Sequence, residues 1–447
     1  MIRAILVFLA AALSCSTVVA ATDAARMDEV TRYYADHDMF MGNVLVAKGE
    51  DVVFSKSYRS ANLELDVPHT LDSKFRIGSV TKQFTAAAIL LLEQRGKLAL
   101  TDAVKTYYPD APATWDKITL LHLLGHTSGI PNYTNTPDLP KLSASHVTPA
   151  ELVKLVQDQP LEFEPGSTMS YSNTGYVLLG MVIEKASGTS YAEFLDVNLF
   201  KPSGMTNTGY DVNAAVLPHR AAGYKRGPSG LENSMYVDMT TPFAAGALYS
   251  TVGDLLRWER ALFGKKILSM ESLNKMTTPG KGDYGMGLFI HPVGARRVIE
   301  HGGGIPGFNS RLTYFPESDV TVVALSNLNG PGPDLIVEKL GALAHGDIVV
   351  LPPERKSIAM RTSDVRRYVG NYQLDPGTMF KVSLDKEQLM ARFNDEGAFP
   401  LRAETRTRFF PEPFEAQIEF QMDAKGKVTG LLMRQNGRDT LAKRVEH

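Results

Sequence analysis

The sequence predicts an α+β protein in two parts, in which an antiparallel sheet with helices is followed by a small domain of strands. Strand-like segments lie near both ends of the first part, and helical apolar patterns lie between them. After residue 351 the period of the apolar residues changes to two, as in the segment 417–422, which is typical of strands. A length of 447 residues exceeds a single ordinary core and also favours two domains.

The first 20 residues have the pattern of a signal peptide. Arg3 is followed by an apolar run and by small residues ending at Ala20, where a signal peptidase would cleave. We therefore expect an exported protein, periplasmic or secreted. The only cysteine, Cys15, lies in this segment, so the cleaved chain would have no disulfide. Leu13 lies one place too late for a lipobox that ends at Cys15, and we expect no lipoprotein anchor.

The elements expected between residues 21 and 350 follow from the apolar patterns. Residues 42–47 and 51–55 predict a hairpin with its turn at 48–50. The strands on both sides of His301 and the segment 320–325 would join this hairpin in one sheet. Helices are expected over residues 80–95, 149–157, 176–187 and 252–263. Leu351-Pro-Pro predicts a linker over 351–359, followed by a second domain over 360–447.

Ser79 and Lys82 form the motif with the clearest chemical meaning. On a helix, positions i and i+3 share a face with Cβ atoms about 5–6 Å apart, so the amine can reach the hydroxyl. A free lysine has a pKa of about 10.4, and it acts as a base near neutral pH only if burial and positive potential lower that pKa by roughly three units. The apolar run 86–92 predicts such burial, and Gly78 permits close approach at the helix N-terminus.

Two alternatives for this motif come from the sequence. Ser79 could only cap a core helix, a role in which serine is common. Ser272-Leu-Asn-Lys275 repeats the motif, but it lies in a polar, Met-rich segment without a long apolar run behind it. We therefore expect Ser79, and not Ser272, to be the reactive serine.

Tyr171 and Asn173 lie in a short loop before an apolar helix. A tyrosine can relay a proton between a nucleophile and a leaving group, and an asparagine can orient Lys82 or a substrate amide. A second Tyr-x-Asn, Tyr133 to Asn135, lies in a turn-rich stretch and is expected at the edge of the site. The alternative for Tyr171 is a buried tyrosine of the core.

A run of three glycines follows His301, between two strand-like segments. Consecutive glycines beside a strand let a backbone N–H group approach a ligand closely, as an oxyanion hole requires, and Gly303 and Gly304 are the candidates. His301 would then face the leaving group or a substrate carboxylate. The alternative is a hairpin turn with a satisfied histidine.

Together these segments resemble the serine β-lactamase and penicillin-binding-protein superfamily, and more closely its class C β-lactamase-related branch. That branch includes family VIII carboxylesterases, D-amino-acid peptidases and penicillin-binding proteins. The resemblance covers about residues 27–340. Its landmarks occur in order at residues 75–85, 123–130, 165–173, 246–255, 284–287 and 301–303.

The resemblance implies a role for each candidate: Ser79 as nucleophile, Lys82 as base, Tyr171 as proton relay, Asn173 as an orienting residue and His301 in the third motif. The backbone N–H groups of Ser79 and Gly304 would form the oxyanion hole. It also implies an antiparallel sheet flanked by helices with an inserted helical subdomain, as in β-lactamases and transpeptidases. The chain departs from the branch at Gly125, where Thr is more common, and at Arg59, where Gly is usual.

The resemblance extends to the C-terminal part, where residues 360–447 are similar to the small lipocalin-like β-barrel of some members. We expect an accessory domain that shapes the site or forms oligomers, rather than a ligand-binding domain.

Other functions find little support in the sequence. A net charge of -2 without a basic run argues against nucleic acid or anionic membrane surfaces as partners. No apolar run after residue 20 reaches the roughly 18 residues of a transmembrane helix. His122 and His126 are spaced i,i+4, but no Glu follows His122, so no metal site is expected. The sequence contains neither a Gly-x-Ser-x-Gly elbow nor a Walker loop, and no cofactor is expected.

The sequence thus predicts an exported serine hydrolase that acts through an acyl-enzyme on amide or ester bonds of a small-molecule or peptide substrate. The expected substrates are D-amino-acid-type peptides or β-lactams, with esterase side activity. One alternative is a family VIII-like carboxylesterase. An alternative of another class is a non-catalytic sensor that binds penicillin or peptidoglycan.

Overall fold

The computed structural model describes residues 23–227, 229–375, 377–394, 397–411, 415–435 and 438–445. The predicted signal peptide, residues 1–20, lies outside the described residues. The chain divides into two compact units, Met1–Asp347 and Ile348–His447. The predicted linker over 351–359 begins close to this division. A six-stranded antiparallel sheet with helices forms one unit and a closed β-barrel the other, so the predicted α+β fold class is confirmed.

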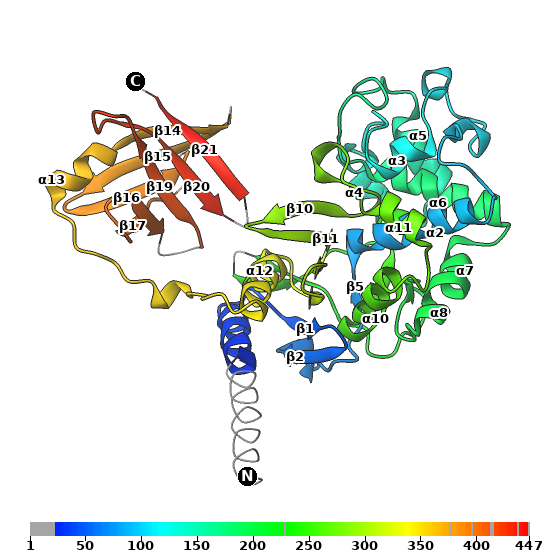
Figure 1. The fold of residues 1–447 in the computed structure, drawn as a ribbon, viewed down its shortest axis with the longest axis horizontal. Coiled ribbons are helices and arrows are strands. Elements are labelled where there is room, and N and C mark those ends of the chain that lie inside the picture. Colours follow the sequence, from blue (N-terminus) through cyan, green and yellow to red (C-terminus); the bar gives the residue numbers. More distant parts are fainter. Residues whose placement is uncertain are drawn as a thin grey trace, which may run out of the picture. The chain divides into compact units, whose positions relative to one another are not determined.

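The sheet of the first unit has the strand order β10-β11-β12-β13-β1-β2 (Figure 1). All neighbouring strands pair antiparallel, and the predicted hairpin is the pair β1 and β2. The N-terminal hairpin joins the sheet through β1, which pairs with β13. The strands are β1 (Gly42–Lys48), β2 (Asp51–Tyr58), β10 (Phe289–Val293), β11 (Arg296–Ile305), β12 (Phe308–Phe315) and β13 (Val320–Ser326).

Helices cover the centre of this sheet. Every residue of β13 is buried. Because successive side chains of a strand point to opposite faces, such a strand is covered on both sides. The helices α10 (Val252–Phe263) and α12 (Gly332–Ala344) both pack against β13 and β1. The described residues from 23 to 36 form a further helix at the start of the unit.

A helical region lies between β2 and β10 in the sequence. Its centre is α2 (Thr81–Gln94), which packs against α6 (Asn173–Ser187) and α9 (Phe243–Gly246), and α2 and α6 are seen side by side in Figure 1. Twelve of the 14 residues of α2 are buried, as its apolar run predicts. The other α-helices here are α3 (Leu120–Leu124), α4 (Leu139–Leu142), α5 (Pro149–Gln157), α7 (Tyr191–Leu195), α8 (Lys201–Ser203) and α11 (Met270–Met276).

The glycine run after His301 belongs to a strand. β11 continues through Gly302–Gly304 to Ile305, and each of these residues has a partner on β12. The chain turns afterwards, at Gly307, whose φ of +86° is left-handed and favours glycine. The alternative of a hairpin turn at the glycines is therefore wrong.

The second unit is a closed antiparallel barrel of eight strands, coloured orange to red in Figure 1. Its buried core contains aromatic side chains, and Tyr368 stacks on Phe420 with 4.4 Å between ring centroids. An eight-stranded barrel is just wide enough for side chains to fill its interior. The strands are β14 (Gly370–Asp375), β15 (Thr378–Asp385), β16 (Gln388–Phe393), β17 (Phe399–Ala403), β18 (Arg408–Pro411), β19 (Gln417–Met422), β20 (Val428–Gln435) and β21 (Arg438–Val445).

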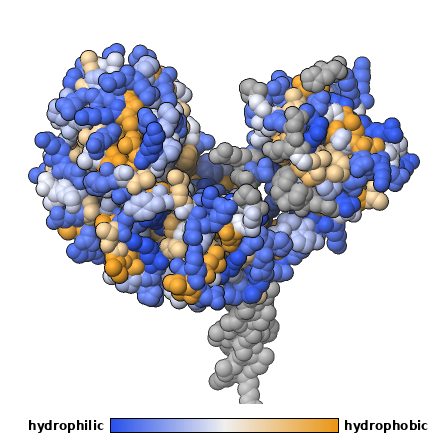
Figure 2. Space-filling view, turned by 180° about the vertical axis from the view of Figure 1, so that it is seen from behind, coloured by the Kyte–Doolittle hydropathy of each residue, from blue (hydrophilic) through white to orange (hydrophobic). Residues whose placement is uncertain are grey.

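The surface of the first unit is mainly hydrophilic on the face shown in Figure 2, with apolar residues in separate groups. Among the described residues, no helix has both the length and the apolar character that a membrane crossing requires.

Candidate active site

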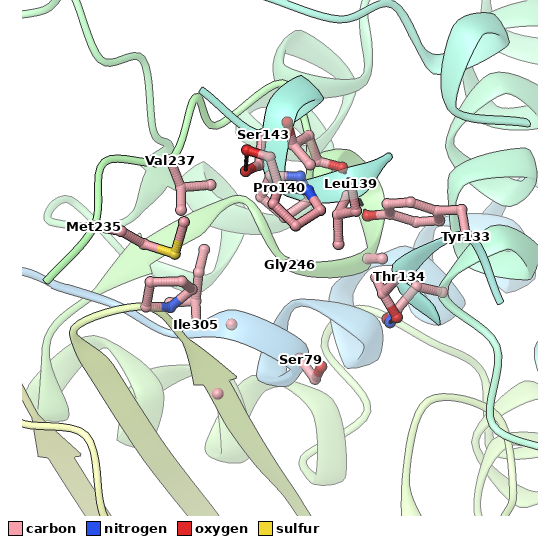
Figure 3. A pocket seen from close by; sticks show the side chains of 17 residues that line it. Ser79, Tyr133, Thr134, Leu139, Pro140, Ser143, Met235, Val237, Gly246 and Ile305 are labelled. Carbon is pink, nitrogen blue, oxygen red and sulfur yellow. Dashed lines mark hydrogen bonds between the residues drawn. The ribbon is translucent and has the colours of Figure 1, made fainter. Parts of the chain in front are cut away.

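Ser79 lies on a short 3-10 turn, η1 (Gly78–Val80), that leads directly into α2. The residue that caps α2 is Val80, and no side chain makes the capping hydrogen bond. The alternative that Ser79 only caps this helix is therefore wrong. Its side chain is partly exposed and lines a cavity (Figure 3), so it is accessible to a substrate.

Lys82, in the first turn of α2, points back at Ser79. Its Nζ lies 3.1 Å from Ser79 Oγ, and it donates to Asn173 Oδ1 and to the carbonyl oxygen of Ala245, both at 2.8 Å. The side chain is fully buried, and none of these three partners carries a negative charge. Burial holds the pKa of Lys82 well below its ordinary value, because the charged form loses its hydration.

This geometry suits a neutral amine. A neutral Lys82 has two N–H donors and one lone pair, and the two amide oxygens, of Asn173 and Ala245, accept from the two donors. The lone pair then faces the hydroxyl of Ser79. The arrangement is that of a base beside a nucleophile.

Asn173 is the first residue of α6, which begins three residues before the predicted start at 176. Its Nδ2 donates to Thr134 Oγ1 over 3.3 Å, and its backbone N–H donates to Asn132 Oδ1 over 3.1 Å. These bonds fix the carboxamide so that its oxygen faces Lys82. The second Tyr-x-Asn segment thus supports Asn173 through its middle residue, Thr134, and through Asn132, which precedes it.

Tyr171 lies beside the same pair, since its ring centroid is 4.8 Å from Lys82 Nζ. Burial raises the pKa of the Tyr171 phenol above its ordinary value, while a side-chain hydrogen bond with Ser79 acts in the opposite direction. The phenol therefore stays protonated near neutral pH. It can give a proton to a leaving group and recover one from Ser79 and Lys82.

Tyr133 is a buried residue whose hydroxyl is already engaged. It donates to the carbonyl oxygen of Thr241 over 2.7 Å. Burial raises the pKa of Tyr133 above its ordinary value. Tyr133 lines the cavity beside Ser79, as expected for a residue at the edge of the site.

The second Ser-x-x-Lys motif has a different environment. Lys275 Nζ forms ion pairs with Glu93 and Glu271, both at 3.2 Å. The hydrogen bonds of these carboxylates raise the pKa of Lys275 above its ordinary value. Ser272 is buried on α11 and interacts with Ser269. A charged lysine cannot serve as a base, which separates this motif from the pair of Ser79 and Lys82.

The glycine strand β11 comes into direct contact with the turn that carries Ser79. A Cβ atom on Gly78 would lie 2.9 Å from the backbone nitrogen of Gly304, and Gly78 has a left-handed φ of +49°. A Cβ on Gly303 would lie 2.0 Å from the carbonyl oxygen of Ile77. Glycine is needed at both positions because the two backbones touch. Ser79 and Gly304 consequently line the same cavity, as an oxyanion hole made by their N–H groups would require.

His301 is buried and uses both ring nitrogens within the protein. Nδ1 lies 2.6 Å from the carbonyl oxygen of Gly302 and must donate to it, so Nε2 accepts from the hydroxyl of Tyr284 over 3.1 Å. Burial lowers the pKa of His301 to about 3. The imidazole is therefore neutral. His301 is not among the described residues that line the cavity beside Ser79.

His122 and His126 do not act together. His122 Nδ1 accepts from the backbone N–H of Thr119, whereas His126 Nδ1 accepts from that of Ser172. Within the described part of the chain, no group of three His, Cys, Asp or Glu side chains could hold a metal ion. The ring of His126 instead packs on Tyr171, with 4.2 Å between centroids.

Sequence reasoning missed some of these contacts. The carbonyl oxygen of Ala245 carries no signal in the sequence, because any residue could supply it. The sequence marks His126 only as part of a landmark and as a candidate metal ligand, whereas in the structure it lies two residues beyond α3, with a left-handed φ of +54°, and packs on Tyr171. Tyr284 appeared only as a landmark, and its bond to His301 could not be inferred from spacing.

The fold and the site define a protein of the serine β-lactamase and penicillin-binding-protein type. A family model described as "Beta-lactamase" matches residues 26–346, and one described as "Domain of unknown function (DUF3471)" matches residues 354–444. The chain belongs to the β-lactamase family, within that superfamily.

Individual relatives agree with this assignment. The chain is 31% identical to Penicillin-binding protein 4* of Bacillus subtilis over 414 residues, which cover 86% of this chain and 90% of the relative. Its structure is similar to that of an octameric penicillin-binding protein homologue from Pyrococcus abyssi, with a TM-score of 0.67, 26% identity and coverage of 94% and 99% of the two chains. It is also similar to a D-stereospecific amidohydrolase from Streptomyces sp., with a TM-score of 0.64, 26% identity and coverage of 73% and 99%.

Proposed function

We propose that this protein is a serine hydrolase that cleaves amide or ester bonds through an acyl-enzyme formed on Ser79. The observation that carries the proposal is the buried Lys82, whose amine lies 3.1 Å from Ser79 Oγ with no carboxylate among its hydrogen-bond partners. Only a neutral amine can take the proton of the serine, and burial favours the neutral form of this one by lowering its pKa.

In the acylation step, Ser79 Oγ forms a bond to the substrate carbonyl carbon and gives its proton to Lys82. The N–H groups of Ser79 and Gly304 stabilise the oxyanion that forms. The bond to the leaving group then breaks, Tyr171 donates its proton to the leaving oxygen or nitrogen, and Lys82 returns a proton to Tyr171. In deacylation, water adds its hydroxyl to the acyl carbon and its proton to Ser79, which restores the enzyme.

The substrate class is supported by the relatives and not by the catalytic residues. A similar structure is named a D-stereospecific amidohydrolase, which supports amides or peptides of D-amino acids as substrates. The penicillin-binding relatives support a β-lactam as an acylating compound. Family VIII-like ester hydrolysis is the alternative, because the same acyl-enzyme serves amides and esters. The non-catalytic sensor differs only in the deacylation step.

The proposal is tested by labelling the protein with a neutral fluorophosphonate and mapping the modified peptide by mass spectrometry. We expect the label on Ser79, and we expect Ser79→Ala to lose both labelling and ester turnover. Ser272→Ala is the matched control and should behave as the wild type. A label on Ser272, or turnover that persists in folded Ser79→Ala, would contradict the proposal.

The rate of deacylation decides between the hydrolase and the sensor. A fluorescent penicillin or an ester substrate should give an initial burst of one equivalent followed by steady turnover. A burst with no turnover would favour the sensor.

We further propose that the chain is exported and that the barrel is an accessory domain. Its filled interior leaves aromatic side chains where a ligand would otherwise bind, which supports a structural role. The similar protein from Pyrococcus abyssi is named octameric, which supports oligomerisation. Light scattering on the full chain after size-exclusion chromatography tests this, and a monomer at all concentrations would contradict it.

A further inference from the structure

The cavity beside Ser79 has a volume of about 250 Å³. Figure 3 shows Ser79 at one end of it, with Met235, Val237 and Ile305 together on one side. Its apolar lining comes from three segments of the chain and consists of Leu139, Pro140, Met235, Val237, Pro242, Ala245, Ile305 and Pro306.

The polar groups of the cavity are neutral. Ser79, Thr134, Ser143 and Thr241 contribute hydroxyls, and Asn173 contributes its amide. The described residues that line the cavity include no Lys, Arg, His, Asp or Glu. Tyr133, whose pKa is raised by burial, remains protonated there and donates to a carbonyl oxygen. A charged group of a substrate would therefore find no counter-charge in this cavity.

The lining also indicates which half of the substrate enters the cavity. Ser79 and Gly304, which would surround the reacting carbonyl, both belong to the lining, and so does Asn173. Tyr171, the proton donor to the leaving group, does not belong to the described lining. In the proposed mechanism the leaving group would lie beside Tyr171, so the cavity would receive the acyl half.

We infer that the substrate of this enzyme has an apolar acyl group without a free carboxylate or a free amine. This inference rests on the proposed acyl-enzyme mechanism and narrows its substrate class. A carboxylate or an ammonium that enters a cavity of neutral groups loses hydration and gains no ion pair, which is costly. An apolar chain gains by leaving water. The enzyme should thus prefer N-blocked or simple aliphatic acyl groups over amino acids with a free α-amine.

Two isosteric pairs of methyl esters test the inference at neutral pH, with acid release followed in a pH-stat. Methyl 4-methylpentanoate has the shape of monomethyl succinate, and methyl butanoate has that of the methyl ester of 3-aminopropanoic acid. We expect the neutral member of each pair to have a kcat/KM about 100-fold higher, because the charged member is desolvated without a partner.

A pair of variants tests whether the cavity causes this preference. Met235 and Tyr236 are adjacent and almost equally exposed, at 54% and 56%. They differ in that Met235 lines the cavity beside Ser79, whereas Tyr236 lines a different cavity. Met235→Lys should reduce the ratio of kcat/KM between methyl 4-methylpentanoate and monomethyl succinate about 10-fold, because the lysine supplies the missing counter-charge for the succinate carboxylate. Tyr236→Lys should leave this ratio of kcat/KM as it is in the wild type. Circular dichroism checks that both variants are folded.

The outcomes separate the inference from the proposed function. If the charged esters are hydrolysed as fast as the neutral ones, or if both lysine variants change the preference equally, the inference is wrong while the acyl-enzyme mechanism stands. If none of the esters is hydrolysed and the fluorophosphonate does not label Ser79, the proposed function itself is wrong.

Discussion

Asn173→Asp would place a carboxylate where Lys82 Nζ now donates to a neutral amide oxygen over 2.8 Å. At an effective dielectric constant of about 20, the attraction between two unit charges at this separation is about 6 kcal/mol, or about four pKa units. The burial of the new carboxylate offsets part of this energy. We therefore expect the pKa of Lys82 to rise by about two to four units in the variant.

The consequence is a displaced pH profile. The base must be neutral, so kcat/KM rises with pH through the pKa of Lys82 and levels off above it. A raised pKa moves this acidic limb to higher pH, and at neutral pH the variant loses about 10²–10⁴-fold in activity because the neutral fraction falls. Above the displaced limb, part of the activity should return.

The measurement is a pH profile of kcat/KM for a neutral ester. The position of the limb is the decisive readout, because a general loss of activity could also follow from a misplaced Asn173. Asn135→Asp, at the exposed asparagine of the other Tyr-x-Asn segment, is the matched control and should leave the limb in place. If the limb of folded Asn173→Asp coincides with that of the wild type, Lys82 is not the base.

Two further predictions concern the relay and the glycine strand. Tyr171→Phe should lose about 10²–10⁴-fold in kcat with an unchanged fold. Tyr133→Phe should mainly lose about 1–3 kcal/mol of unfolding free energy, because it leaves the buried carbonyl oxygen of Thr241 without its donor. If Tyr133→Phe instead lost the activity and Tyr171→Phe the stability, Tyr133 would be the proton relay. Gly303→Ala should cost about 1–3 kcal/mol in chemical denaturation, because its Cβ would lie 2.0 Å from a backbone oxygen. Gly302→Ala is its control, because a Cβ on Gly302 would meet only the end of the flexible Arg311 side chain, 3.0 Å away. Equal losses of stability in the two variants would refute the contact between Gly303 and Ile77.

The local sequence was sufficient to predict that Ser79 and Lys82 meet. Ser79 and Lys82 are three residues apart, and the start of a helix alone brings them together. The apolar run of α2 likewise predicted the burial of the helix, because periodicity and hydrophobicity are properties of a short segment. The change of period after residue 351 predicted the second unit for the same reason.

The tertiary structure decided what these residues can do. Burial lowers the pKa of Lys82, and its amine is positioned by oxygens that lie 91 and 163 residues away, at Asn173 and Ala245. The hydroxyl of Tyr133 is occupied by a carbonyl 108 residues away, whereas Tyr171 lies beside Lys82. The apolar lining of the neutral cavity likewise combines three distant segments. Sequence spacing fixes which side chains share a helical turn, but hydration and long-range contacts depend on the path of the whole chain, and these set the pKa values and the shape of the site.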